Sequence, residues 1–193
     1  MAEILLFHHA LGQTSGFLAF AEQLRRAKHT VHTPDLYEGH TFTSLEEGVA
    51  YAKKTGFGEI GERGRRAAEG LPPGLVYAGF SLGVMPAQAL AQTRPGAKGA
   101  LLFSSAFPSE EFGGPWPATV PLQIHMMEAD PWVLEGDLEA ARQLVTSAQR
   151  AELFLYPGNG HLFADKSVAD YDPKAAALLM ERVLSFLNKV DSS

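Results

Sequence analysis

The sequence predicts an α/β fold: a doubly wound, mostly parallel sheet of about six strands with helices on both faces. Three observations support this prediction. Short apolar runs alternate along the chain with longer amphipathic stretches. The apolar runs are nearly continuous, which is typical of parallel strands that crossover helices bury on both faces. Hydrophobic residues make up 46% of the chain and charged residues 20%, the balance of a globular protein.

The expected strands are short and apolar, and many of their residues are β-branched or aromatic. In chain order they are Ile4–His8, Thr30–Thr33, Leu75–Gly79, Gly99–Ser104, Leu122–Met126 and Glu152–Tyr156. Between them, apolar residues recur at intervals of three and four, the period of an amphipathic helix. The expected helices are Ser15–Lys28, Leu45–Glu69, Leu82–Gln92, Leu138–Ala148 and Ala175–Val190, and the Gly- and Pro-rich stretch Pro108–Pro121 is expected to be a loop.

Length and charge limit the class of protein. A chain of 193 residues fits one domain, which we expect to span residues 1–193. The net charge of −6 disfavours a nucleic-acid partner, and the one dense basic cluster, Arg63, Arg65 and Arg66, alternates with glutamates as on a solvated helix face. The chain has neither a basic leader nor an apolar run long enough to cross a membrane. We therefore expect a cytoplasmic protein without a membrane partner.

A motif with catalytic geometry follows the third expected strand. Ligands of open α/β sheets bind beyond the carboxyl ends of the strands, and Gly79-Phe80-Ser81-Leu82-Gly83 lies at such an end and opens a helical stretch. This is the context of a nucleophile elbow, a turn so sharp that the serine is strained and its neighbours must be small. The chain has no cysteine, which excludes a thiol nucleophile and disulfides. The alternative interpretation is an ordinary turn with Ser81 as a helix cap.

Asp130 and His161 complete an expected catalytic triad. Asp130 follows the strand Leu122–Met126; its Asp-Pro pair is also typical of a helix start, and Glu128 is the nearest substitute acid. His161 lies in a glycine-rich loop directly after the last strand. The order Ser, Asp, His, each after a different strand, is the order that α/β hydrolases use. We expect Ser81 as the nucleophile, His161 as the general base and Asp130 as the acid that orients it.

Two backbone amides are expected to bind the oxyanion of the tetrahedral intermediate. They belong to Leu82, the residue after the nucleophile, and Ala10, in the loop after the first strand. This chemistry requires neither a metal nor a cofactor. His8 and His9 suggest a metal site, but adjacent strand residues point to opposite faces and cannot both reach one ion. One of the two is expected in the core and the other in the pocket wall.

The chain resembles the dienelactone hydrolase family from end to end. The segments that carry the resemblance are the first-strand loop followed by Gly12, then Thr33-Pro34-Asp35-Leu36-Tyr37, the Ser81 motif, Glu128-Ala129-Asp130, and Tyr156-Pro157-Gly158 running into Gly160-His161-Leu162-Phe163-Ala164. The resemblance implies a shortened α/β-hydrolase fold that begins at the strand of the oxyanion loop.

Three residues depart from the best-known members of that family. Ser81 stands where they have a cysteine, and His9 stands where they have a glutamate beside the oxyanion donor. The resemblance therefore implies an ordinary Ser-His-Asp cycle without their cysteine–glutamate activation switch. Asp165 stands four residues after His161, where they have an arginine that binds the substrate carboxylate. This reversal predicts a neutral or cationic substrate; the alternative is that Asp165 faces solvent and another cation, such as Lys166, reaches the carboxylate.

The expected function is hydrolysis of a small-molecule ester or lactone through an acyl-enzyme. An apolar pocket is expected to hold the substrate, with His9, Tyr37 and Trp116 in its wall. Thioester hydrolysis would use the same residues. A catalytically silent binding protein on a hydrolase scaffold is the alternative from another class, because a fold does not guarantee activity. The sequence leaves the oligomeric state open.

Overall fold

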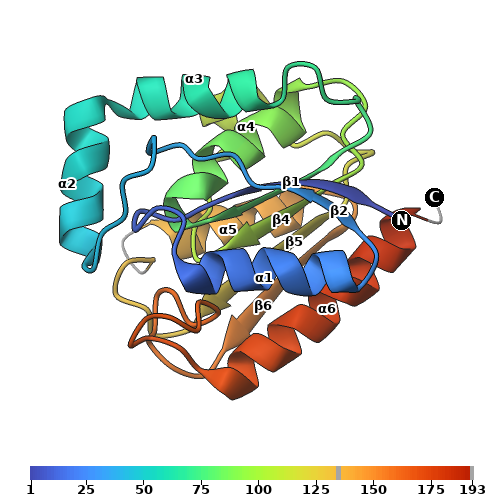
Figure 1. Ribbon diagram of the computed structural model, residues 1–193. Coiled ribbons are helices and arrows are strands. Elements are labelled where there is room, and N and C mark those ends of the chain that lie inside the picture. The colour runs from blue at the N-terminus through green and yellow to red at the C-terminus, as the bar shows by residue number, and fades with distance from the viewer. Residues whose placement is uncertain (134–135, 192–193) are drawn as a thin grey trace.

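The computed structural model describes residues 1–133 and 136–191, so residues 134–135 and 192–193 of the expected domain lie outside the described part. The described chain forms a six-stranded sheet, in which all neighbouring strands are parallel (Figure 1). Its order is β2-β1-β3-β4-β5-β6. The strands are β1 (Glu3–Phe7), β2 (Thr30–His32), β3 (Val76–Phe80), β4 (Gly99–Phe103), β5 (Leu122–Met127) and β6 (Ala151–Tyr156). The predicted parallel α/β architecture is confirmed, with strand ends that differ by one residue at most.

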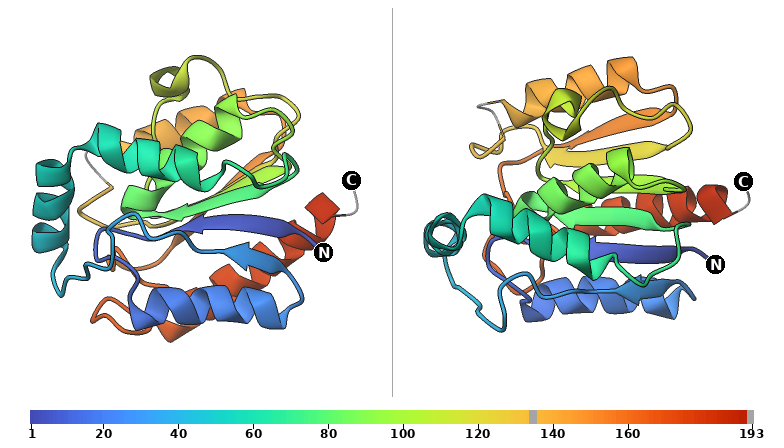
Figure 2. Two further views of the ribbon diagram at one scale, coloured as in Figure 1. Left: turned by 45° about the horizontal axis from the view of Figure 1, so that its top comes forward. Right: turned by 90° about the horizontal axis from the view of Figure 1, so that it is seen from above.

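Helices cover both faces of the sheet (Figure 2). One face carries α1 (Ser15–Arg26) and α6 (Pro173–Asp191), and the other carries α3 (Phe57–Ala67), α4 (Val84–Thr93) and α5 (Asp137–Ser147). Alternate strand residues point to opposite faces. Accordingly, Ile4 and Leu6 of β1 pack in the core with α1 and α6, whereas Leu5 and Phe7 pack in the core with α3, α4 and α5.

The connections place a topological switch point at β1. From β1 the chain passes to β2 on one side, then returns across β1 to β3 on its other side and continues outward to β6. The loops that leave β1 and β3 therefore diverge and open a crevice at the carboxyl ends of these strands, where open α/β sheets bind ligands. Helix α2 (Leu45–Thr55) lies beyond these strand ends (Figure 1).

The helix expected over Leu45–Glu69 is two helices, and this part of the prediction is wrong. Gly56, with φ of 95°, ends α2 and begins α3. That backbone conformation costs glycine little and any other residue more, so the chain turns there although the apolar period continues. The basic cluster lies on α3, where Arg65 forms ion pairs with Glu62 and Glu69, as expected for a solvated helix face.

The loop after β4 and the lengths of the helices complete the description. The expected loop Pro108–Pro121 contains a short 3₁₀ turn, Ser109–Phe112. No helix in residues 1–133 and 136–191 combines the length and the apolar character that crossing a membrane requires.

Candidate active site

Ser81 is the first residue of a 3₁₀ turn, Ser81–Gly83, that connects β3 to α4. Its φ is 49°, in the left-handed region that non-glycine residues rarely adopt. A Cβ on Gly79 would lie 2.1 Å from the carbonyl oxygen of Gly83, and a Cβ on Gly83 would lie 2.6 Å from the carbonyl oxygens of Phe7 and His8. The turn therefore has the strain and the close backbone approach of a nucleophile elbow.

Three strand ends bring Ser81, His161 and Asp130 into one hydrogen-bonded chain. The Oγ atom of Ser81 lies 2.7 Å from Nε2 of His161, and Nδ1 of His161 lies 2.6 Å from Oδ2 of Asp130. Because the carboxylate accepts at Nδ1–H, Nε2 is left to accept the serine proton. Asp130 is fully buried, and its Oδ1 accepts a hydrogen bond from the Trp132 amide at 2.9 Å. Glu128, the substitute acid, is exposed.

Ser104 supports the backbone of His161, a role that the sequence did not predict. It follows β4, is buried, and donates from Oγ to the carbonyl oxygen of His161 at 2.6 Å. Its φ is 59°, so it is a second strained serine at a strand end. Its position after an apolar strand was the available signal. The ring of Trp132 also lies beside the base, with its centroid 5.8 Å from that of His161.

A cavity of about 470 Å³ opens onto Ser81. Its wall is largely apolar and includes Phe57 from α3 and Met85 from α4. Among the described residues, two acids also line it, Glu111 and Asp137, and no lysine or arginine does. The described residues that line it are Ala10, Val49, Phe57, Ser81, Leu82, Met85, Ser104, Ser105, Phe107, Glu111, Trp132, Asp137 and His161. Burial raises the pKa of Asp137, although its carboxylate accepts a hydrogen bond from Ser105 Oγ at 2.6 Å.

Comparisons with known proteins show to which family a chain with this fold belongs. The model of the dienelactone hydrolase family matches residues 2–191. The chain belongs to the dienelactone hydrolase family. A comparison with curated proteins finds no match.

Solved structures share the fold of this dienelactone hydrolase family member at low sequence identity. A dienelactone hydrolase-like promiscuous phosphotriesterase from metagenomic libraries has a TM-score of 0.74 and 15% identity, covering 98% of this chain and 87% of that one. A cold-adapted esterase from an Arctic intertidal metagenomic library has a TM-score of 0.61 and 16% identity, covering 95% and 82%. The thioesterase domain of the curacin biosynthetic pathway has a TM-score of 0.61 and 18% identity, covering 95% and 90%. These likenesses establish the α/β-hydrolase fold and leave the scissile bond undetermined.

The two residues expected to donate to the oxyanion both line the cavity. Ala10 comes from the turn after β1, and Leu82 directly follows Ser81. Helix α2 packs against the Ala10 turn so closely that a Cβ on Gly48 would lie 1.9 Å from the Ala10 carbonyl oxygen. The roles of these amides remain predictions, since an oxyanion donor is defined by its distance to the reacting oxygen.

The aromatic residues expected in the pocket wall of this family member are buried elsewhere, and this prediction is wrong. Tyr37 is fully buried and donates its hydroxyl to the Gly48 carbonyl at 3.0 Å, so it supports α2 instead of facing substrate. Trp116 is buried in the core and donates its indole N–H to the Val120 carbonyl at 2.7 Å. Burial of these large rings is favourable because each one's polar atom has a hydrogen-bond partner there.

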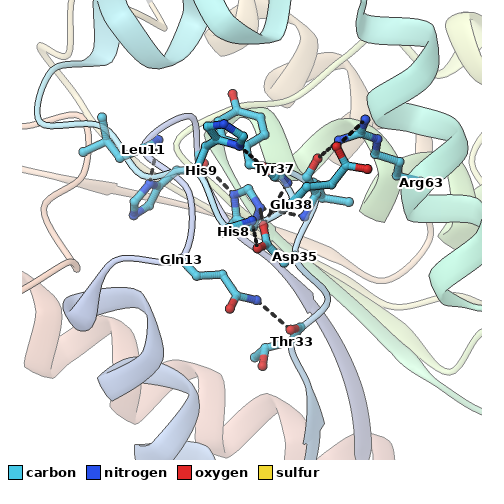
Figure 3. A network of polar contacts seen from close by, with 12 residues as sticks. His8, His9, Leu11, Gln13, Thr33, Asp35, Tyr37, Glu38 and Arg63 are labelled. Atoms are coloured by element: carbon cyan, nitrogen blue, oxygen red, sulfur yellow. Dashed lines mark hydrogen bonds and ion pairs between the residues drawn. The ribbon is translucent and has the colours of Figure 1, made fainter. Parts of the chain in front are cut away.

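His8 and His9 are both buried, and neither is among the described residues that line the cavity. Figure 3 shows both side chains among their polar contacts. Nδ1–H of His8 donates to the His9 carbonyl at 2.7 Å, and Nε2 of His8 accepts from the Leu36 amide at 2.9 Å. This imidazole joins the turn after β1 to the loop after β2. The expectation of one core histidine was correct, and the expectation of one pocket histidine was wrong.

The structure also contradicts both interpretations of Asp165. This residue is buried, so it does not face solvent, and it is not among the residues that line the cavity, so it does not face a substrate there. Its carboxylate instead lies 2.8 Å from Nε2 of His9. The two positions at which this chain departs most visibly in charge from the best-known family members are thus partners of each other.

Proposed function

We propose that this dienelactone hydrolase family member hydrolyses carboxylic ester or lactone bonds through an acyl-enzyme on Ser81. The observation that supports the proposal best is the chain of short contacts from Ser81 Oγ through His161 to Asp130, at 2.7 and 2.6 Å. A serine hydroxyl is a weak nucleophile and requires such a base. Ser81 and His161 line the cavity, which is large enough for a small molecule.

In the first half of the proposed cycle, Ser81 Oγ attacks the carbonyl carbon while its proton passes to Nε2 of His161. The carbonyl oxygen becomes an oxyanion between the amides of Ala10 and Leu82. The C–O bond to the alcohol then breaks, and His161 returns the proton to the leaving oxygen. Asp130 holds the tautomer of His161 and stabilises the imidazolium while it exists.

In the second half, water takes the place of the leaving alcohol. His161 removes a proton from this water, whose oxygen attacks the acyl carbon. Collapse of the second tetrahedral intermediate breaks the bond to Ser81 Oγ, which recovers its proton from His161. The products are a carboxylic acid and an alcohol, or a hydroxy acid from a lactone. A thioester would follow the same steps with a thiol as the leaving group.

The proposed substrate is neutral or cationic, with an apolar acyl or alcohol part. Asp165 does not support this charge preference, because its carboxylate binds His9 and does not line the cavity. Glu111 and Asp137 support it instead, because both line the cavity and no lysine or arginine in the described part of the chain does. A carboxylate on the substrate would be repelled at short range in a partly desolvated site.

The test is covalent labelling with a fluorophosphonate, followed by assays on chromogenic esters, lactones and thioesters. Wild-type protein should be labelled on Ser81 and should turn over at least one class of substrate. Ser81→Ala should be unlabelled, and His161→Ala should lose several orders of magnitude in kcat, because the residues of a triad act as a unit. Folded wild-type protein that neither reacts with the probe nor hydrolyses any substrate would favour the silent binding protein.

A further inference from the structure

His9 and Asp165 form a buried pair beside the proposed active site, and nothing in the proposed cycle uses it. Nε2 of His9 lies 2.8 Å from Oδ2 of Asp165, and both side chains are almost completely excluded from solvent. A buried polar pair is costly unless each member is satisfied.

The hydrogen bonds of His9 fix its tautomer. The Leu11 amide donates to Nδ1 at 3.3 Å, so Nδ1 carries no proton and Nε2–H donates to Asp165 (Figure 3 shows the Leu11 contact). Burial lowers the pKa of His9, and this outweighs the opposing effect of the Asp165 carboxylate. His9 is thus a neutral imidazole with both ring nitrogens engaged, one by the turn after β1 and one by Asp165.

Asp165 is held as rigidly as its partner. Its carboxylate accepts from the Ser167 amide at 2.8 Å, from Ser167 Oγ at 2.6 Å and from the Thr14 hydroxyl. Burial raises the pKa of Asp165, but the hydrogen bonds from His9, Ser167 and Thr14 outweigh it, and the pKa lies well below its usual range. Gly16 leaves no free space on this side, because a Cβ there would lie 1.6 Å from Oδ1.

The pair spans the three segments that the proposed reaction has to align. His9 directly precedes Ala10, the expected oxyanion donor, and Asp165 lies in the loop between β6 and α6 that also carries His161. The ring of His9 also packs edge-on against Phe80, the residue before Ser81, with centroids 6.3 Å apart. A shift of His9 would therefore move the Ala10 turn relative to both Ser81 and His161.

We propose that His9 and Asp165 are a positioning pair that fixes the oxyanion-binding turn relative to Ser81 and His161. The pair touches neither the cavity nor the substrate, so it acts through the Ala10 amide. This inference rests on the proposed function. It predicts that disturbing the pair weakens binding of the transition state and leaves binding of the ground state nearly unchanged, because an oxyanion exists only after the attack.

Two substitutions of His9 each keep one half of its hydrogen bonding. Gln at this position places an amide near the location of Nε2 and keeps the bond to Asp165, whereas Asn places an oxygen near Nδ1 and keeps the bond to Leu11. Each variant should lower kcat about ten- to a hundredfold with KM within about threefold of wild type. The affinity for a boronic acid, which forms a tetrahedral adduct on Ser81, should fall in parallel with kcat/KM.

His125→Asn is the matched control. His125 is an equally buried imidazole in the same sheet, on β5, where it contacts the Tyr156 hydroxyl at 2.8 Å. This variant should lose thermal stability yet keep kcat and boronic acid affinity near those of wild type. Folded His9→Gln and His9→Asn variants with the kcat of wild type would overturn the positioning role, as would a loss of activity in the control that matches theirs.

Nitrogen-15 NMR of the wild-type imidazoles tests the pair without any variant. The structure requires the shift of an unprotonated, hydrogen-bonded Nδ1 and a protonated Nε2 for His9. The opposite tautomer would overturn the proposal even if the His9 variants failed to fold. Failure of the proposed function gives a different result: wild-type Ser81 would then be unlabelled by fluorophosphonate, and the positioning role would fall with it.

Discussion

The two oxygens of the Asp130 carboxylate have different partners: Oδ2 lies 2.6 Å from Nδ1 of His161, and Oδ1 accepts from the Trp132 amide at 2.9 Å. The hydrogen bond from the Trp132 amide orients the carboxylate, and the carboxylate in turn fixes the tautomer of His161. Asp130 is the only acid of the two sequence candidates that the structure brings to His161, because Glu128 is exposed and its amide pairs with the Tyr156 carbonyl.

Asp130→Asn should therefore lower kcat by about 10³- to 10⁴-fold while the protein stays folded, because the amide no longer selects the reactive tautomer. Steady-state kinetics on the best ester from the substrate panel measures this. Glu128→Gln removes a charge two residues away and should change kcat by less than about threefold. Reversed effects in the two variants would transfer the role of the acid to Glu128.

Gly79→Ala should destabilise the protein by about 3 kcal/mol or more, because the new Cβ would lie 2.1 Å from the backbone oxygen of Gly83. Gly58→Ala is the matched control: its Cβ meets no atom within 4 Å, and alanine favours the helix α3 in which it lies. Denaturant unfolding of both variants measures the difference. Wild-type stability in Gly79→Ala would mean that the elbow is less tightly packed than described.

Asp137→Asn should reduce the preference for cationic substrates over neutral ones of the same shape. Because Asp137 lines the cavity, removing its charge should lower the ratio of the two kcat/KM values about tenfold at low salt and about pH 8. Glu139→Gln, on the exposed side of the same helix α5, removes the same charge away from the cavity and should leave the ratio unchanged. Faster turnover of anionic esters than of neutral ones by wild type would contradict the charge argument.

Stability should fall as the pH drops below about 6.5 because of buried neutral histidines. Burial, aided by the nearby charge of Arg182, lowers the pKa of His125 from 6.5 to about 3, and burial lowers that of His9 as well. Between the unfolded and the folded pKa of such a histidine, the unfolded chain binds a proton that the folded protein does not bind. Each one therefore lowers the free energy of unfolding by about 1.4 kcal/mol per pH unit as the pH falls.

Urea unfolding between about pH 6.5 and 4.5 measures this dependence, above the range in which aspartates titrate. Asp35 contributes only at lower pH. The His8 imidazole, whose Nε2 lies 3.5 Å from Oδ1, and hydrogen bonds from the Tyr37 and Gly39 amides lower the pKa of Asp35 to about 2, so its contribution to stability is lost only below the ordinary value of 3.8. His125→Gln should reduce the slope of unfolding free energy against pH by the contribution of one proton, about 1.4 kcal/mol per pH unit. An unchanged slope in this variant would show that His125 titrates normally in the folded protein.

The sequence by itself determined the features that depend on local pattern. Apolar runs separated by amphipathic stretches predict buried parallel strands, and Gly79-Phe80-Ser81-Leu82-Gly83 predicts the elbow, because steric exclusion at a sharp turn is a property of neighbouring residues. The order of Ser81, Asp130 and His161 was readable for a related reason. Parallel strands end at the same edge, so residues that follow different strands converge there.

The tertiary structure alone decided what surrounds Ser81, Asp130 and His161. Val49, Phe57 and Asp137 reach the cavity from α2, α3 and α5, and no sequence period records which helix ends face a strand end. The sequence likewise could not show that Tyr37 would be buried under α2. His9 and Asp165 lie 156 residues apart and meet at 2.8 Å, since their pairing depends on how two loops fold over the edge of one sheet. Contacts of that kind are fixed by packing in three dimensions, where each partner's burial is acceptable only because the other satisfies it.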